Sequence, residues 1–260
     1  MSDILVELTE IRRHDVRMRE VEVPFREMAE RAAAAPEPRD FAAAFRGEGT
    51  RVIAELKRAS PSEGMIRDEF HPVELAKELE ASGAAALSVL CEPHRFLGDE
   101  EYLKAVRSVV GLPILYKDFI STRYQLLAAR AAGADAALLI AAVLDDVALK
   151  GLIGFARGLG LAALVETHDE TEIDRAVSCG AKIVGVNCRN LRNFTTDVSL
   201  LESLVGRIPR PCLRVAESGM HTAEAIRRAQ AAGADGFLVG TALMRADKPG
   251  EKLKELLTNH

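Results

Sequence analysis

The amino-acid sequence predicts an α/β protein in which eight parallel β-strands alternate with α-helices and close into a (β/α)8 TIM barrel. Short apolar runs alternate with amphipathic, helix-length stretches from residue 51 to residue 258, which is the rhythm of such a barrel. Four of the apolar runs share one shape, because each follows a helix-like stretch that ends at a glycine: Gly83, Gly133, Gly180 and Gly233. These glycines recur about every 50 residues, which is the length of two βα units.

The strands and helices of this barrel can be placed in order. The strands that follow the four glycines are expected within residues 82–90, 132–140, 179–186 and 232–239, and the other four at residues 52–57, 113–118, 161–166 and 213–218. These runs are rich in Val, Ile and Leu, as buried parallel strands are. Helices are expected at residues 72–82, 100–110, 123–132, 145–159, 170–179, 200–206 and 222–232. An open doubly wound sheet is the alternative, but the GxGxxG fingerprint after its first strand is missing.

The segment before the barrel, residues 1–50, is expected to be a helical extension that packs on the barrel. Helical patterns cover residues 4–19 and 28–35, and a stretch with two prolines at residues 36–40 ends the second one. We interpret this segment as a lid or plug over one end of the barrel. Residues 1–260 would then form a single domain.

Composition and charge exclude several classes of protein. With 34 basic and 39 acidic residues the net charge is −5, whereas a general nucleic-acid binder should carry a basic surplus. No signal peptide and no uninterrupted apolar run of about 18 residues is visible, so a cytoplasmic protein without a membrane span is expected. The four scattered cysteines favour reduced thiols over a disulfide framework or a metal site.

Polar residues stand at the ends of five predicted strands, where barrel enzymes place their active sites. These residues are Glu55, Lys57, Lys117, Glu166, Asn187, Arg189, Glu217 and Ser218. Because an unpartnered charge buried in a barrel is costly, so many polar strand ends converging on one rim indicate a ligand site. Lys57 and Lys117 could protonate an oxygen of a substrate, and Glu166 could abstract a proton. His168, close to Glu166, is expected to cap a helix or to face solvent.

A phosphate site is expected at the loops after the seventh and eighth strands, where barrels commonly bind phosphate. These loops contain Ser218-Gly219 and Gly240-Thr241, whose small residues let backbone N–H groups approach an anion. Lys57 or Arg189 could supply a cation. The loop at residues 58–64 has few apolar anchors, so we expect it to be mobile and to close over bound substrate.

Five motifs resemble the indole-3-glycerol phosphate synthase family. They are VIAELKRASPSEG at 52–64, LPILYKDF at 112–119, LVETH at 164–168, GVNCRNL at 185–191 and VAESG at 215–219. The resemblance extends from about residue 38 to residue 256. It implies a carbon–carbon lyase of tryptophan biosynthesis that acts on 1-(2-carboxyphenylamino)-1-deoxyribulose 5-phosphate. Such an enzyme closes a pyrrole ring, releases CO2 and water, and needs no cofactor or metal.

The resemblance also implies roles for individual residues. Lys117 would be the acid that assists ring closure, Glu166 the acid or base of the dehydration, and Lys57 a substrate-binding cation that shares in proton transfer. Glu55, Asn187 and Glu217 would orient these groups. The remaining substrate contacts would be Arg189, Ser218, Gly219, Gly240 and Thr241 at the phosphate, Ser60 in the first loop, and Phe96, Phe119, Leu138 and Leu238 at the aromatic ring and the pocket wall. The protein would be a monomer or a weak homodimer.

Two other functions remain open at this point. A barrel related to phosphoribosylanthranilate isomerase would use an acid–base pair, usually Cys and Asp, and would carry a Cys where the first strand ends in Lys57. A non-catalytic barrel that binds a phosphorylated metabolite would keep Ser218 and Gly240. It would have no need of Lys57, Lys117 and Glu166 together.

Overall fold

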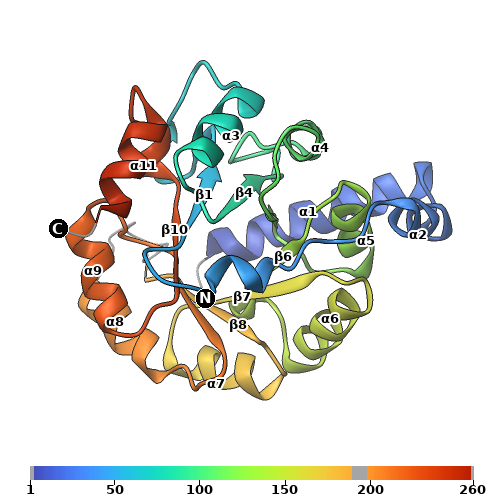
Figure 1. Ribbon diagram of the computed structural model, residues 1–260. Coiled ribbons are helices and arrows are strands. Elements are labelled where there is room, and N and C mark those ends of the chain that lie inside the picture. The colour runs from blue at the N-terminus through green and yellow to red at the C-terminus, as the bar shows by residue number, and fades with distance from the viewer. Residues whose placement is uncertain (1–2, 189–197, 259–260) are drawn as a thin grey trace.

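The computed structural model describes residues 3–188 and 198–258, and its centre is a closed barrel of eight parallel strands. The strands follow one another around the barrel in the order β1-β10-β9-β8-β7-β6-β5-β4, and β1 closes it by pairing with both β10 and β4 (Figure 1). Their bounds are β1 (Val52–Leu56), β4 (Ala86–Leu90), β5 (Ile114–Lys117), β6 (Ala136–Ile140), β7 (Ala162–Thr167), β8 (Ile183–Val186), β9 (Leu213–Ala216) and β10 (Gly236–Val239). The predicted fold is confirmed.

Helices surround the barrel as an outer ring (Figure 1). They are α3 (Pro72–Ala81), α4 (Glu100–Arg107), α5 (Arg123–Ala131), α6 (Asp146–Gly158), α7 (Glu170–Ser178), α8 (Val198–Arg207), α9 (Ala223–Ala231) and α11 (Pro249–Leu257), with the short α10 (Thr241–Met244) directly after β10. Side-chain caps fix several of the starts; Thr122 and Gln125, for example, form a capping box on α5. The four glycines of the repeat all have positive φ, as predicted for helix ends. The helix expected at residues 100–110 ends earlier, at Arg107, where a turn leads into β5.

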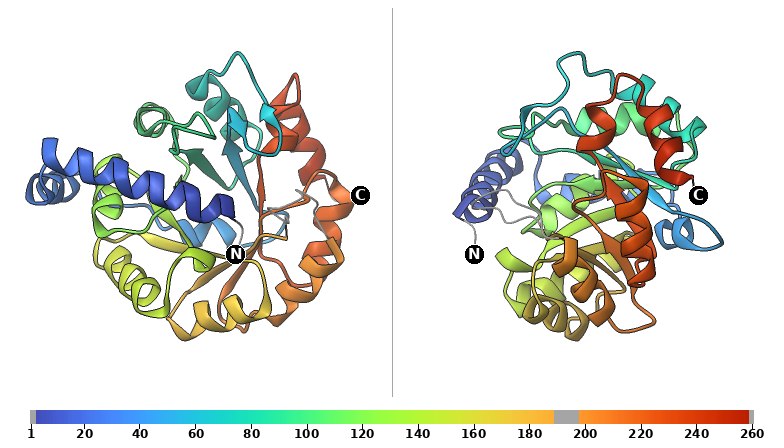
Figure 2. Two further views of the ribbon diagram at one scale, coloured as in Figure 1. Left: turned by 180° about the vertical axis from the view of Figure 1, so that it is seen from behind. Right: turned by 90° about the vertical axis from the view of Figure 1, so that its left-hand side faces the viewer.

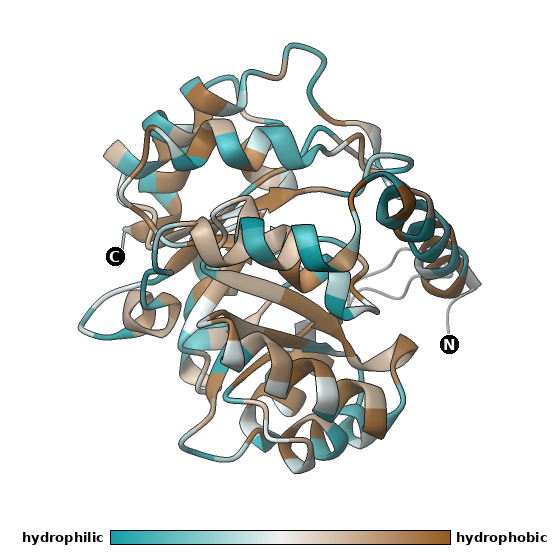
Figure 3. Ribbon diagram, turned by 90° about the vertical axis from the view of Figure 1, so that its right-hand side faces the viewer, coloured by the Kyte–Doolittle hydropathy of each residue, from teal (hydrophilic) through white to brown (hydrophobic). Residues whose placement is uncertain are grey.

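The core has two layers, one inside the barrel and one between the barrel and the helices. Successive side chains of a strand point to opposite sides, so in β1 Ile53 belongs to the inner cluster while Val52 and Ala54 belong to the outer one. The central strands are accordingly mostly apolar, whereas the helices are apolar on one face and polar on the other (Figure 3). Most of the acidic and basic residues of the strands stand at or next to their carboxyl ends.

The extension before the barrel reaches both of its mouths. Helix α1 (Asp3–Glu22) crosses the mouth at the carboxyl ends of the strands, and the 3-10 helix η1 (Phe41–Phe45) covers the opposite mouth (Figures 1 and 2). Between them, α2 (Phe25–Ala34) packs on α5. At the mouth that η1 covers, the Phe45 ring occupies the space in front of Gly236, where an added Cβ would lie 2.3 Å from the ring. The extension therefore covers both mouths of the barrel, whereas the sequence predicted that it would cover one end.

Two short elements after β1 were not predicted. Strands β2 (Ala59–Ser60) and β3 (Gly64–Met65) form an antiparallel hairpin within the loop that was expected to be mobile. Ala59 and Ser60 are buried, so the first half of the loop is anchored. Another 3-10 helix, η2 (Ala141–Val143), follows β6. Closure of the loop over substrate stays a prediction.

Two features bear on the excluded classes of protein. In the described part of the chain, no helix combines the length and the apolarity that crossing a membrane requires. Cys91, Cys179, Cys188 and Cys212 are all free thiols, and all four are buried. The expectation that the cysteines lie within the core is confirmed.

Candidate active site

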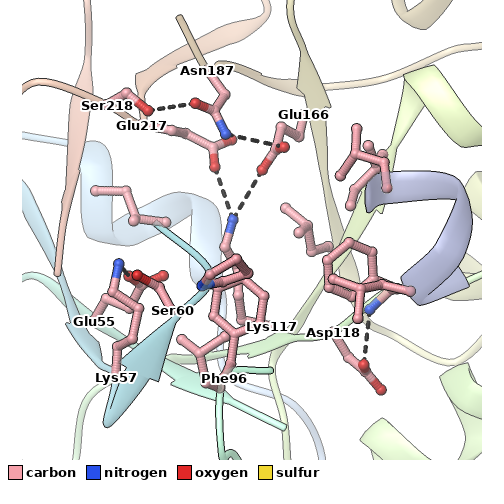
Figure 4. Close-up of a pocket in the computed structure, with 18 of the residues that line it drawn as sticks. Glu55, Lys57, Ser60, Phe96, Lys117, Asp118, Glu166, Asn187, Glu217 and Ser218 are labelled. Carbon is pink, nitrogen blue, oxygen red and sulfur yellow. Dashed lines mark hydrogen bonds and ion pairs between the residues drawn. The ribbon is translucent and has the colours of Figure 1, made fainter. Parts of the chain in front are cut away.

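A pocket opens at the carboxyl-end mouth of the barrel, beneath α1 (Figure 4). It gathers residues from the strand ends, from the loops after β1 and β4, and from α1. Of the predicted site residues it is lined by Glu55, Lys57, Ser60, Phe96, Lys117, Phe119, Leu138, Glu166, Asn187, Glu217, Ser218 and Leu238. Gly219, Gly240 and Thr241 line an adjoining hollow. Arg189 lies outside the described residues.

Lys117, the last residue of β5, forms the centre of the polar side of this pocket (Figure 4). Its Nζ lies 3.0 Å from Glu166 Oε2 and 3.0 Å from Glu217 Oε2. All three side chains are almost completely buried, and they come from β5, β7 and the end of β9. Burial alone would lower the pKa of Lys117, but the surrounding carboxylates, Glu166 first, raise it above its usual value. Lys117 therefore carries its proton at neutral pH.

The two carboxylates beside Lys117 have opposite properties. Burial raises the pKa of Glu217, the ion pair with Lys117 lowers it, and with the repulsion from Glu166 it stands at about 8. Burial also opposes ionisation of Glu166, but Lys117 and His168 outweigh it and hold the pKa of Glu166 well below its usual range. The site thus combines a glutamate that ionises readily with one that holds its proton more strongly, an arrangement that separates a base from an acid.

Asn187 and Ser218 join the two sides of the polar network. Asn187 Nδ2 donates a hydrogen bond to Glu166 Oε1 at 3.2 Å, and Ser218 Oγ donates to Asn187 Oδ1 (Figure 4). The Ser218 hydroxyl, predicted from sequence as a phosphate contact, is therefore also linked to Glu166 through Asn187.

His168 contacts the site residue Glu166, contrary to expectation. Asp169, not His168, caps helix α7, and the His168 side chain is only 19% exposed. Its Nε2 lies 3.4 Å from Glu166 Oε1, and its Nδ1 lies 3.1 Å from Glu172 Oε2. Burial would lower the pKa of His168, but the two glutamates raise it to about 10. Sequence position alone could not show this, because it depends on the direction in which the chain leaves β7.

Two glycines make room for the buried carboxylates. A Cβ on Gly185, in β8, would lie 1.8 Å from Glu217 Oε1, and a Cβ on Gly240 would lie 2.1 Å from Glu55 Oε2. Glu55 pairs in turn with Lys57, whose Nζ lies 2.8 Å from Glu55 Oε2. The two-residue spacing of Glu55 and Lys57 in the sequence does bring them to one side, as predicted.

The hollow beside Lys57 has the features of an anion site. It is bordered by the four small residues predicted to bind phosphate: Ser218, Gly219, Gly240 and Thr241. Gly219 adopts a φ of +79°, in the region that favours glycine. Lys57, which is paired with Glu55, lines both this hollow and the main pocket, and it is the cation that an anion in the hollow would approach; Glu55 and Glu217 line the hollow as well.

The opposite side of the pocket is apolar and aromatic. The ring centroids of Phe96 and Phe119 lie 6.1 Å apart, and Leu138 and Leu238 extend the wall. Helix α1 adds Ile4, Leu5 and Leu8, which sequence reasoning did not assign to the site. Their spacing places them on one face of a helix, but only the fold reveals that this face covers the pocket. The bidentate pairing of Arg12 with Asp118, at 2.8–3.2 Å, fixes α1 beside Lys117.

Solved structures of other proteins share this architecture. 3-Hexulose-6-phosphate synthase from Salmonella typhimurium superposes with a TM-score of 0.64 at 14% identity, over 80% of this chain and 96% of that one. Thiamine phosphate pyrophosphorylase from Pyrococcus furiosus gives a TM-score of 0.59 at 18% identity, over 80% and 93% of the two chains. At such low identity these likenesses support the barrel fold alone.

Sequence relatives are much closer. The chain is 47% identical to indole-3-glycerol phosphate synthase of Streptomyces griseus over 98% of its length and 94% of that protein. It is 46% identical to the enzyme of Micrococcus luteus, over 96% of each chain, and 43% identical to that of Campylobacter jejuni subsp. doylei, over 98% and 100%. The family model for indole-3-glycerol phosphate synthase matches residues 5–256. The chain therefore belongs to the indole-3-glycerol phosphate synthase family.

Proposed function

We propose that the chain converts 1-(2-carboxyphenylamino)-1-deoxyribulose 5-phosphate into indole-3-glycerol phosphate, a step of tryptophan biosynthesis. The ring carbon that bears the carboxylate forms a bond to the C2 carbonyl carbon, and the carbonyl oxygen takes up a proton. CO2 then leaves that ring carbon. Removal of a C1 proton and departure of the new hydroxyl as water then complete the indole. The observation that best supports this chemistry is the buried ammonium group of Lys117, which lies 3.0 Å from a carboxyl oxygen of each of two buried glutamates, Glu166 and Glu217.

Lys117 is the acid of the ring closure in this proposal. It holds a proton at neutral pH, and its ammonium group faces the pocket at the end of β5. A carbonyl oxygen bound beside Nζ would receive that proton, or a strong hydrogen bond, as negative charge develops on it. Glu217, protonated over much of the neutral range, would return a proton to Lys117.

Glu166 acts in the dehydration. As an ionised carboxylate it is a base for the C1 proton, and once protonated it can assist departure of the hydroxyl as water. Asn187 holds one of its oxygens and thereby orients it. These two functions require the carboxylate to face the same substrate carbon chain that Lys117 contacts, and both groups line one pocket.

Substrate binding would divide between the two sides of the pocket. Ser218, Gly219, Gly240 and Thr241 would surround the phosphate with Lys57, which Glu55 orients, and Arg189 would add a second cation. Phe96, Phe119, Leu138 and Leu238 would pack on the aromatic ring, and Ser60 of the first loop would line the pocket beside them.

The setting of the reaction is part of the same proposal. The four buried free thiols fit a reducing compartment, so we place the enzyme in the cytoplasm. We propose that it needs no cofactor, metal, nucleic acid or membrane, and that it works as a monomer or weak homodimer. Because α1 lines the pocket, residues 1–260 would act as one catalytic domain.

A direct assay tests the proposal. The purified chain is mixed with the carboxyphenylamino substrate, and indole fluorescence and released CO2 are followed together. One CO2 per indole product is expected. Phosphoribosylanthranilate supplied alone should remain unchanged. Conversion of that compound without CO2 release would favour the isomerase, and binding of the carboxyphenylamino substrate without turnover would favour a non-catalytic protein.

A further inference from the structure

The loop between β4 and α4 contains a fully buried carboxylate, that of Glu92. Its oxygens accept three backbone hydrogen bonds: Oε1 from the N–H of His94 at 2.8 Å, and Oε2 from the N–H groups of Arg95 and Phe96 at 2.7 and 2.8 Å. Within residues 3–188 and 198–258, no cationic side chain forms an ion pair with Glu92 at hydrogen-bonding distance. Backbone amides thus compensate for the loss of hydration of this carboxylate.

The backbone around Glu92 is held in a costly conformation. Leu97 has a φ of +51°, the one positive value at a non-glycine residue in the described chain. The N–H of Gly98 donates to the Glu92 carbonyl at 2.7 Å, and a Cβ on Gly98 would lie 2.3 Å from the Leu90 carbonyl oxygen. The loop therefore folds back tightly against the end of β4. Such conformations persist only where surrounding contacts enforce them, and they gather at functional sites.

The role of this loop conformation follows from the contacts of His94, Arg95 and Phe96, the three residues whose N–H groups bind Glu92. Phe96 is the loop residue that lines the pocket (Figure 4). Its ring packs against that of Phe119. His94 and Arg95 point outward instead and bind α1, through Asp15 at 2.8 Å and Glu7 at 3.1 Å. One carboxylate thus fixes the residue of the aromatic wall together with the two that attach the α1 lid.

We propose that Glu92 is a positioning residue that sets the place of Phe96 and so builds the binding surface for the aromatic ring of the substrate. It does so without touching substrate, through the backbone N–H of Phe96. Because the aromatic surface is then formed before substrate arrives, binding does not have to order it. This inference rests on the proposed function, since it assumes that an aryl ring occupies that side of the pocket.

The test compares ligands with and without the ring. Glu92→Gln keeps the shape of the side chain, but its amide NH2 must face at least one backbone N–H. We expect the affinity for the substrate analogue whose ketone is reduced to an alcohol to fall about tenfold, the size of one or two lost hydrogen bonds. The affinity for inorganic phosphate should stay within about twofold, a change too small to reflect a lost contact. Glu101→Gln, on the exposed face of α4, is the matched control and should change neither.

A double-mutant cycle shows whether the effect passes through Phe96. In a Phe96→Ala background, Glu92→Gln should cause no further loss of affinity for the analogue. Equal losses for analogue and phosphate, or full additivity with Phe96→Ala, would overturn the inference and leave Glu92 as a general stabiliser of the fold. Normal analogue binding by Glu92→Gln would overturn it as well.

Hydrogen exchange on the wild-type protein covers the case in which the variant fails to fold. The amides of Arg95 and Phe96 should be strongly protected, although Arg95 lies in an exposed loop. Rapid exchange at both would refute their bonds to Glu92. An inactive wild-type protein would instead refute the proposed function. If the wild type is active and binds the analogue no more tightly than Glu92→Gln does, only the role of Glu92 is refuted.

Discussion

Replacing Gly185 with alanine should damage the active site from a position that never contacts substrate. The added Cβ would lie 1.8 Å from Glu217 Oε1, whereas ordinary contact begins near 3.4 Å, so the carboxyl group must move by about 1.6 Å. β8 cannot yield, because it is paired on both sides, Gly185 with Glu166 of β7 and with Val215 of β9. The displaced carboxyl group of Glu217 loses its 3.0 Å contact with Lys117 Nζ.

The size of the effect follows from that displacement. A misplacement of about 1 Å in a catalytic site can lower a rate about 10²-fold, so we expect kcat/KM to fall by at least that factor. Overpacking of this kind also costs about 1–3 kcal/mol of unfolding free energy. Both quantities are measurable, the first by indole fluorescence and the second by denaturant unfolding.

Two controls isolate the clash with Glu217. Gly154→Ala, in α6, adds a Cβ with no atom within 4 Å and should keep full activity with equal or slightly higher stability. In a Glu217→Ala background, Gly185→Ala should cause no further loss of stability, because the clashing group is gone, while activity stays low. Full activity and unchanged stability of Gly185→Ala would refute the account of how Glu217 is held.

Three further predictions concern the polar side of the pocket. Lys117→Met should lower kcat by about 10²- to 10⁴-fold while the far-ultraviolet circular dichroism stays native. His168 has a pKa raised from 6.5 to about 10, so its contribution to stability is complete below pH 6.5 and is lost as the pH rises through 10. The Tm of the wild type should therefore fall more between pH 7 and 10 than that of His168→Asn. Phosphate soaked into crystals should bind against the backbone of Gly219 and Gly240, next to Ser218.

Each of these predictions can fail in a distinct way. A loss of less than about threefold in kcat for Lys117→Met would remove its role as an acid. Parallel Tm curves for the wild type and His168→Asn would mean that His168 is not held in its charged form by Glu166 and Glu172. Phosphate bound at the η1 end of the barrel, with the hollow at Gly240 unoccupied, would contradict the proposed anion site.

Much of the polar site follows from sequence because its residues interrupt apolar strands. A lysine or glutamate at the end of a Val- and Leu-rich run has few structural explanations, and the barrel brings all such ends to one rim. For Glu55 and Lys57 the spacing in the sequence was enough to predict a contact. Side chains two residues apart in a strand lie on the same side, and Lys57 Nζ lies 2.8 Å from Glu55 Oε2.

Contacts between distant segments could not be predicted in this way. Arg12 and Asp118 form a hydrogen bond although 106 positions of sequence separate them. The spacing of apolar residues in α1 predicts an apolar face, but it does not predict that this face covers a pocket. Gly185 is a small residue in a buried strand, and its purpose appears only when the side chain of Glu217 fills the space in front of it. His168 was misjudged for the same reason, since its two carboxylate partners depend on how β7 joins α7.

The order of strands around the barrel implies how substrate would lie. The proposed proton-transfer groups come from β5, β7 and the end of β9. The hollow proposed to bind the phosphate lies between the ends of β9, β10 and β1, and the aromatic wall follows β4 and β5. A substrate with a phosphate at one end and an aryl ring at the other can meet both only by spanning the mouth. Its carbonyl carbon would then lie near the centre of the barrel mouth, where Lys117 Nζ lies between Glu166 and Glu217. Closing the ring requires the aryl group to fold back toward that carbon, and the Phe96 wall limits how far the ring can move away.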